Sequence, residues 1–439
     1  MMKKLTFKIG GIHPPQSKET PAGVIIRPEL PREVTILLKQ HAGAEAVPVV
    51  AKGDHVVRGQ KIAEASGFIS APVHASISGT VKSVGPALTL EGRYAQAVVI
   101  SASDDDYVAD MKAIDAEEIR NTDNISPEDI IGQIANCGVV GLGGATFPAA
   151  VKLSSAGDKA KLLVIDGCEC EPRLTCDDAV MRMHADEIVG GIKLMLKALR
   201  INRAVIGIED NKPHAIKALS EACASEPGIE VVALKAKYPQ GGEKMLVYAV
   251  TGREIPSGCL PISVGCVVNN VGTARAVYRA VALGEPLIER VVTIEGLGNF
   301  LLPIGISVGE VIKAYDKDGR YDFDAIDGEI DLINGGPMMG RSISNIYGPL
   351  TKGVSGIISV RHVHANVEPC IRCGSCQQAC PMGLQPFLLE SYGRHGLIAE
   401  AKQAGALDCI ECGSCSYSCP SARPILDYIR LCKFKIRAK

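Results

Sequence analysis

Eight of the sixteen cysteines in this 439-residue chain stand in two copies of one motif near the C-terminal end. Both copies have the spacing C-x2-C-x2-C-x3-C-P, and thiolates at this spacing are typical ligands of [4Fe–4S] clusters. Zinc is the alternative metal, but one zinc site takes only four ligands. The motifs therefore predict two [4Fe–4S] clusters, with the ligands Cys370, Cys373, Cys376, Cys380, Cys409, Cys412, Cys415 and Cys419.

The fourth cysteine of each motif is predicted to serve the cluster of the other motif. A short helix should begin after the third cysteine, so the fourth points away from its own cluster, and the proline that follows restricts the chain. Cys380 would then complete the cluster of Cys409, Cys412 and Cys415, and Cys419 would complete the other. Residues 384–406 are predicted to form the helical linkers that bring the two halves together.

A glycine-rich loop at residues 141–148 precedes a predicted helix that contains Lys152. Gly141, Gly143 and Gly144 would let backbone N–H groups approach a phosphate, which the start of a helix also favours. A packing turn is the alternative, because no clear strand leads into the loop as a dinucleotide fingerprint requires.

Polar residues follow the first strand of a predicted α/β unit. Residues 162–165 form a short buried strand, and Asp166, Glu169 and Glu171 come directly after it. Ligands of open α/β sheets bind at the carboxyl ends of the strands. Helix capping is the alternative role of the two glutamates. Two further polar segments follow at residues 238–243 and 269–273.

The pattern of the chain predicts a multidomain α/β and β protein with four units. Residues 1–115 are β-rich and resemble the sandwiched half-barrel of lipoyl and biotin carrier domains, without a lysine at the central hairpin, where His74 stands. An acidic linker is expected from Asp104 to about Pro127. Residues 116–284 form the α/β unit, 285–365 contain short β segments, and 366–439 hold the clusters.

Within the α/β unit, strands are predicted at 162–165, 204–208 and 229–234, with a helix at 213–224. This alternation favours a parallel sheet that is covered on both faces. Apolar residues with spacings of three and four predict one continuous helix whose buried face comprises Met181, Ala185, Ile188, Ile192, Met195 and Leu199.

Composition excludes several classes of function. A net charge of −2 and 4% aromatic residues without tryptophan argue against binding of nucleic acid. No signal peptide and no apolar run of about 18 residues is present, so a cytoplasmic protein is expected. Three further cysteines lack a convincing fourth partner for a third metal site and are interpreted as packing residues: Cys168, Cys170 and Cys176.

The order of these motifs resembles that of the NADH-binding flavoprotein subunit of respiratory complex I. Over essentially all of its length the chain is similar to the C subunit family of the Rnf complex, the bacterial membrane-associated ferredoxin:NAD⁺ oxidoreductase. The segments 10–15 and 207–213 and the twin cysteine motifs belong to this resemblance. Residues 289–293 and 308–312 resemble the soluble-ligand-binding β-grasp module of both families, which assigns that fold to residues 285–365.

The resemblance implies a noncovalent FMN and a site for NAD(H). Thr146, Ala149-Ala150 and Asp166 depart from the usual residues of these families. NAD(H) would stack on the flavin beside Phe147, Glu169 and Glu171. The implied flavin site comprises the loop from Gly141 through Gly143 and Gly144, with Lys152, Asp166, Tyr238, Glu243, Asn269 and Asn270.

The resemblance also implies a function. Electrons from reduced ferredoxin would arrive through a second iron–sulfur subunit, cross the two clusters and reach NAD⁺ through the flavin. Integral membrane subunits would couple this flow to the movement of Na⁺ or H⁺, with this chain docked peripherally on the cytoplasmic side of the cell membrane. Two alternatives are a soluble flavin- and cluster-dependent cobalamin reductase and a non-enzymatic iron–sulfur carrier.

Overall fold

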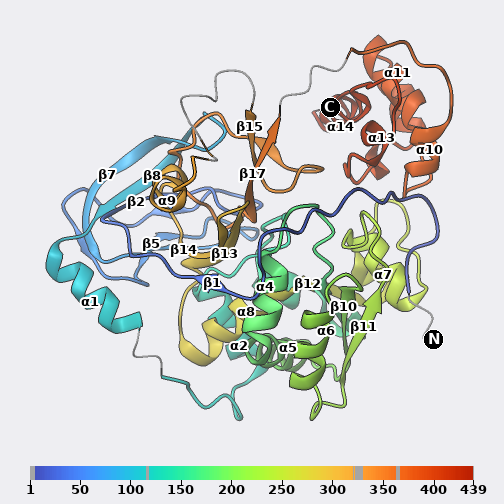
Figure 1. The fold of residues 1–439 in the computed structure, drawn as a ribbon. Helices are drawn as coiled ribbons and strands as arrows, with labels where there is room; N and C mark the ends of the chain where they lie inside the picture. Colours follow the sequence, from blue (N-terminus) through green and yellow to red (C-terminus); the bar gives the residue numbers. More distant parts are fainter. Residues whose placement is uncertain (1–4, 115–117, 320, 322–329, 362–365, 439) are drawn as a thin grey trace.

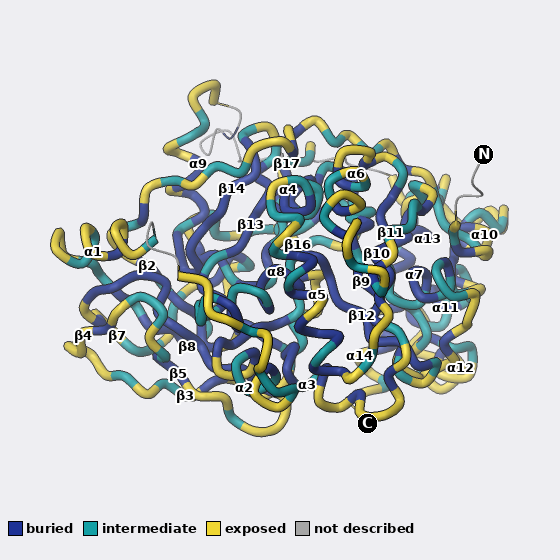
Figure 2. The backbone as a smooth tube through the Cα atoms, turned by 90° about the horizontal axis from the view of Figure 1, so that it is seen from below, coloured by how far each residue is buried: buried dark blue, intermediate teal, exposed yellow. Residues whose placement is uncertain are grey.

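The computed structural model describes residues 5–114, 118–319, 321, 330–361 and 366–438, which form four sheets and a set of C-terminal helices (Figure 1). The predicted unit boundaries at 115/116 and 365/366 adjoin segments outside these described residues. Figure 2 shows that the strands β10, β12 and β14 are buried along their lengths. In the described part of the chain, no helix is both long and apolar enough to cross a bilayer.

The N-terminal unit consists of two small antiparallel sheets that enclose one core. One sheet has the order β2 (Glu33–Leu37), β8 (Tyr94–Ser101), β7 (Gly79–Leu88), β4 (His55–Val56), and the other the order β3 (Val47–Pro48), β5 (Lys61–Glu64), β6 (Val73–His74). Alternate residues point inward, so side chains such as Ile36, Ile62 and Ile100 are buried. The half-barrel prediction is thereby confirmed.

The expected acidic linker is wrong at its start, because α1 (Asp104–Ile114) is a helix. Three aspartates occupy its first turn, where the partial positive charge of a helix favours them. Ser103 stands just before the helix and exchanges hydrogen bonds with Asp106: the Asp106 N–H donates to Ser103 Oγ at 3.2 Å, and the Ser103 N–H donates to Asp106 Oδ2 at 3.0 Å. This reciprocal capping begins a helix in a segment that composition alone assigns to a linker.

The α/β unit contains a fully parallel sheet in the order β11 (Ile229–Leu234), β10 (Ala204–Glu209), β9 (Leu162–Gly167), β12 (Cys266–Asn270). Helices α2 (Pro127–Asn136), α5 (Ala185–Leu199), α6 (Pro213–Ala222) and α8 (Val271–Tyr278) contribute to the core on one face. Helix α7 (Glu243–Thr251) packs on the other face. A parallel sheet covered on both faces is therefore confirmed.

The long helix predicted through Met181 and Leu199 is in fact two helices, α4 (Cys176–Met183) and α5. The break lies at His184, whose backbone (φ −134°, ψ 37°) leaves the helical region. The imidazole Nδ1 of His184 lies 2.7 Å from Glu187 Oε1 in the first turn of α5. The apolar spacing continues across the break because both helices pack on the same core.

The third unit is built on a six-stranded sheet, β1 (Ile25–Ile26), β14 (Gly298–Pro303), β13 (Glu289–Ile294), β17 (Gly356–Arg361), β15 (Ile330–Asn334), β16 (Arg341–Ser342). Helix α9 (Val308–Tyr315) packs against it, with Ile312 and Phe300 in the core. Strand β1 comes from the N-terminal part of the chain and pairs parallel to β14.

The C-terminal unit is helical, as the cysteine motifs predict. Helices α10 (Ser375–Ala379) and α13 (Ser414–Tyr417) each follow a glycine with positive φ, Gly374 and Gly413, inside a cysteine motif. The predicted linkers are α11 (Pro386–His395) and α12 (Ile398–Gln403), and α14 (Ile425–Arg437) closes the unit. The two motifs thus fold alike.

Residues 5–21, which we call the N-terminal strap, run between the units (Figure 1). Leu5 and Ile12 form bridges with Leu234 and Tyr238 of the α/β unit, and the Gly11 N–H donates to the Ala379 carbonyl in the C-terminal unit. The strap then reaches the third unit, where Asn299 donates to the Pro21 carbonyl. One extended segment therefore contacts three units.

Candidate functional site

The polar segments predicted from the sequence meet at the carboxyl ends of β9 and β12. The sheet order places β10 and β11 on one side of β9 and β12 on the other, so the strand order reverses between β9 and β12. Asp166 and Asn270 are register partners across this point. Ligands of doubly wound sheets bind where the strand order reverses.

The glycine-rich loop lies over the end of β12. The Gly141 N–H donates to the Phe147 carbonyl at 2.9 Å and closes the loop. A Cβ on Gly143 would lie 3.2 Å from Asn270 Cβ, whereas one on Gly144 would meet nothing within 4 Å. Thr146, at a family glycine position, has the positive φ of 48° that glycine adopts without strain. The loop thus presents exposed backbone beside the strand ends.

Side chains from three other elements complete this arrangement. Lys152, in the short helix α3 (Ala149–Ser154), donates to the Val268 carbonyl at 2.9 Å and lies 3.3 Å from Glu243 Oε1. A Cβ on Gly241 would lie 3.2 Å from Asp166 Oδ2, so the Gly241–Glu243 turn approaches the end of β9 closely. The structure therefore brings the predicted lysine, glutamate and aspartate together.

Buried polar groups at this site are incompletely paired. Burial raises the pKa of Asp166 to about 6, although its carboxylate accepts a hydrogen bond from the Cys168 N–H at 3.0 Å. The Asn269 and Gln240 amide nitrogens are buried without a hydrogen-bond partner among the described residues. Such groups favour a bound polar molecule, because an unpaired buried donor is costly. An exposed glycine loop, a lysine and unpaired amides fit a phosphate-bearing cofactor such as FMN.

The loop after β9 holds the two predicted glutamates in different ways. Glu169 caps α4, because its carboxylate accepts hydrogen bonds from the Asp177 and Asp178 N–H groups at 2.7 and 3.4 Å. Glu171 accepts a hydrogen bond from the Met338 N–H at 3.0 Å, and burial raises its pKa to about 7. Glu169 therefore makes the helix-capping contact that was the alternative to a role in binding. Contact of Glu169 or Glu171 with NAD(H) stays a prediction.

Lys18 of the strap organises the same loop. Its ammonium donates to the backbone carbonyls of Glu169, Glu171 and Leu174 at 2.8, 2.8 and 2.6 Å. Lys212 donates to the Cys168 carbonyl at 2.6 Å. Sequence reasoning missed both lysines, because no local pattern reports a contact between residues so far apart in the chain.

Electrostatic interactions connect seven of the eight cysteines into two sets, one of four and one of three. Burial, with smaller contributions from Cys409, Cys412 and Cys380, raises the pKa of Cys415 to about 12. Burial likewise raises the pKa of Cys376, with further contributions from Cys419 and Cys370. Each set includes one cysteine from the other motif, as the crossed arrangement requires, and Cys373 is assigned to the outer group by its place in the first motif. Cluster binding by these crossed groups stays a prediction. We call Cys380, Cys409, Cys412 and Cys415 the inner group, and Cys370, Cys373, Cys376 and Cys419 the outer group.

The donor set bears on the choice of metal. All sixteen cysteines are free thiols, so the eight motif cysteines are available as ligands. Eight thiolates in two motifs fit two [4Fe–4S] cores.

The inner group faces the rest of the molecule. The Tyr238 hydroxyl, on a side chain that is 1% exposed, donates to the Cys412 carbonyl at 2.7 Å. A Cβ on Gly413 would lie 2.9 Å from the Met338 carbonyl of the third unit. In the outer group, Cys370 and Cys373 are exposed. The predicted flavin residue Tyr238 thus contacts the backbone of a predicted cluster ligand.

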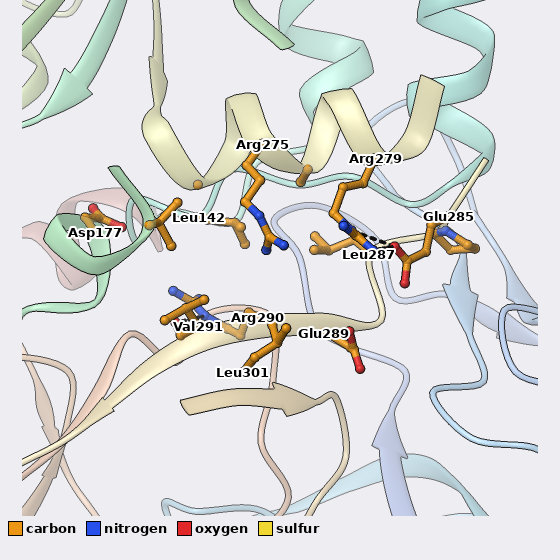
Figure 3. A pocket seen from close by; sticks show the side chains of 14 residues that line it. Leu142, Asp177, Arg275, Arg279, Glu285, Leu287, Glu289, Arg290, Val291 and Leu301 are labelled. Carbon is orange, nitrogen blue, oxygen red and sulfur yellow. Dashed lines mark hydrogen bonds and ion pairs between the residues drawn. The ribbon is translucent and has the colours of Figure 1, made fainter. Parts of the chain in front are cut away.

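A separate cavity lies between α8 and the β13–β14 hairpin (Figure 3). Arg275 and Arg279 point into it from the helical side, and Arg279 pairs with Glu285. Leu142 connects it to the glycine loop, but none of the predicted site residues line it. Arg275 and Arg279 also pair with Glu187. Despite burial, the hydrogen bond with His184 and these two arginines lower the pKa of Glu187 to about 2. The cavity is therefore lined in part by the Arg279–Glu285 ion pair.

Family models match three parts of the chain. The Nuo51 FMN-binding domain matches residues 134–279, which include the glycine loop and the strand ends. The RnfC barrel sandwich hybrid domain matches residues 5–105. A 4Fe-4S dicluster domain matches residues 362–420. Fold and site thus define a flavin- and iron–sulfur-dependent oxidoreductase component, with FMN and two [4Fe–4S] clusters as its cofactors.

Curated relatives match the whole chain. The C subunit of the proton-translocating ferredoxin:NAD(+) oxidoreductase complex of Clostridium ljungdahlii is 43% identical, over 98% of this chain and 94% of that protein. Its counterpart in the Na(+)-translocating complex of Acetobacterium woodii is 40% identical, over 100% and 98%. The corresponding protein of the Haemophilus influenzae ion-translocating oxidoreductase complex is 40% identical, over 97% of this chain and 66% of that protein. The chain belongs to this RnfC family.

Proposed function

We propose that this chain exchanges electrons between NAD(H) and ferredoxin as a peripheral subunit of an ion-translocating membrane complex. One observation supports this most: the inner cysteine group packs against the same α/β unit whose strand ends meet the glycine loop. When bound, FMN exchanges two electrons with NAD(H) and one at a time with an iron–sulfur cluster. The relatives that match the full chain are named as subunits of such complexes.

The chemistry of each residue indicates which part of FMN or NAD(H) it would contact. Backbone N–H groups at Gly143 and Gly144, together with Lys152 of α3, would hold the FMN phosphate, and Gly141 would shape the loop through its bond to the Phe147 carbonyl. Phe147, Glu169 and Glu171 would form the NAD(H) side. The remaining polar contacts to the flavin would come from Asp166, Tyr238, Glu243, Asn269 and Asn270.

The same assignment extends to the clusters and to the partners. The inner and outer groups would each bind one [4Fe–4S] cluster. We propose that the chain is divided into four units, at residues 1–115, 116–284, 285–365 and 366–439. The chain would dock on the cytoplasmic side of the membrane, with an iron–sulfur subunit that receives electrons from ferredoxin and with integral membrane subunits as its partners.

Flavin content tests the proposal. Gly144→Val should abolish FMN binding and NADH-dependent dye reduction while the iron content stays that of the parent, because the side chain fills the space above the loop. Gly157→Val is the matched control, since Gly157 also has positive φ and open space. A Gly144→Val protein with its full flavin complement would place the phosphate elsewhere.

Measurements on the parent protein distinguish the proposal from the two alternative functions. Two clusters without flavin would indicate the non-enzymatic carrier, and NADH-dependent reduction of a corrinoid would indicate the cobalamin reductase. Membrane association is tested by extraction: the chain should copurify with membrane subunits in mild detergent and be released by alkaline wash. Retention after that wash would contradict a peripheral subunit.

A further inference from the structure

The backbone of the inner group is contacted at two of its four cysteines by residues outside the C-terminal unit. At Cys412 the contact is the hydrogen bond from the Tyr238 hydroxyl to the carbonyl oxygen, at 2.7 Å. Tyr238 is almost completely buried, so water cannot compete for this carbonyl. A hydrogen bond in such a setting is stronger than one at the surface.

The second contact is made by the N-terminal strap at Cys380. Gly10 has φ +62°, and a Cβ there would lie 2.3 Å from the Cys380 carbonyl oxygen and 2.7 Å from Pro381 N. The next residue, Gly11, donates its N–H to the Ala379 carbonyl at 2.9 Å. Both the backbone angle and the close approach require glycine at position 10.

The two contacts belong to one connected structure. The Ile12 N–H donates to the Tyr238 carbonyl at 2.9 Å, and the Tyr238 N–H donates to the Ile12 carbonyl at 2.9 Å. Beside them, the Lys237 ammonium lies 4.0 Å from the centre of the Phe7 ring. The strap and Tyr238 therefore fix one another as well as the backbone of the inner group.

We propose that Tyr238 and Gly10-Gly11 are positioning residues for the cluster of the inner group, which they hold against the α/β unit, and that the Tyr238 hydroxyl raises the reduction potential of that cluster. The proposal rests on the proposed function for the presence of that cluster. Donors around a cluster and exclusion of water both tune its potential. A donor on the Cys412 carbonyl withdraws electron density from that ligand, which makes the added electron more favourable.

The hydroxyl of Tyr238 is tested first, by redox titration followed by EPR. Cys412→Ser and Cys373→Ser assign the two signals to the inner and outer groups. Tyr238→Phe should shift the midpoint potential of the inner signal to a more negative value, with the outer signal unchanged. Tyr417→Phe is the control, because Tyr417 is an exposed tyrosine within the second motif. An inner signal whose midpoint potential stays that of the parent protein, whatever the flavin content, would overturn the proposal.

The strap is tested by Gly10→Ala. The added methyl should displace the strap, change the inner EPR signal and increase hydrogen exchange of residues 8–14. Gly396→Ala is the control, because Gly396 has a similar φ of +70° in the C-terminal unit with nothing within 4 Å. Unchanged signals in Gly10→Ala would refute the role of the strap. Absence of both signals in the parent protein would instead refute the proposed function, so the two failures are distinguishable.

Discussion

The inner and outer cysteine groups have the same spacing in sequence but different surroundings in the structure. The cysteines of the inner group lie against Tyr238 and the strap, whereas Cys370 and Cys373 of the outer group are exposed. Solvent exposure and hydrogen bonding set cluster potentials, so two identical motifs need not give equal clusters. The difference in surroundings favours a difference in potential between the two clusters, set by which group the rest of the chain covers.

The largest expected effect comes from removing Cys380 or Cys419, the cysteine that each motif is predicted to contribute to the cluster of the other motif. Cys380→Ala should remove or convert the cluster of Cys409, Cys412 and Cys415, although Cys380 belongs to the first motif. Cys419→Ala should do the same to the outer cluster. EPR of each variant, with signals assigned through Cys373→Ser and Cys412→Ser, decides the matter. A Cys380→Ala protein that loses only the outer signal would show that each motif binds its cluster independently.

Whether the sequence predicts a feature of the two groups depends on how far apart in the chain the contacting residues lie. The crossed groups follow from local spacing, and the meeting of Asp166 with Asn270 follows from strand ends in a parallel sheet. The break at His184 was missed, because apolar periodicity reports which face is buried but not whether the backbone stays helical. The asymmetry between the two groups was also missed, since it depends on residues far away in sequence, such as Gly10.

The second prediction concerns the side of the molecule that the inner group faces. Lys18→Met keeps the length of the side chain but leaves three carbonyls of the Glu169–Leu174 loop without their donor. Each lost bond to a charged donor costs about 1.5–3 kcal/mol, and shared relaxation brings the total to about 3 kcal/mol. Urea unfolding should show this loss of stability, and the KM for NADH should rise.

The matched control is Lys193→Met. Lys193 makes one surface ion pair, with Glu226 at 2.6 Å, and such pairs contribute little to stability. If Lys18→Met and Lys193→Met were equally stable, the loop would not depend on the strap. The inner and outer groups would then differ only in the contacts that their cysteines make with the rest of the chain.

The smallest expected effect is a pH dependence at Glu171, whose carboxylate accepts a hydrogen bond from Met338, next to the inner group. Burial raises its pKa in the folded protein to about 7, from 4.5 in the unfolded chain. Between these values the folded state binds the proton more tightly, so stability falls as pH rises from about 4.5 to 7. At 1.36 kcal/mol per pKa unit the ceiling is about 3 kcal/mol, and relaxation leaves about 1–2 kcal/mol.

Glu171→Gln isolates this contribution, because an amide of the same shape does not titrate and its oxygen can still accept the Met338 N–H. The variant should match the parent protein near pH 4 and exceed it in free energy of unfolding at pH 8. Glu368→Gln, at an exposed carboxylate beside Cys370, should follow the parent at both pH values. Urea unfolding at the two pH values measures the difference. If Glu171→Gln were no more stable than the parent at pH 8, the carboxylate would be solvated or paired when ionised. The inner side would then differ from the outer side in its backbone contacts and not in its buried charge.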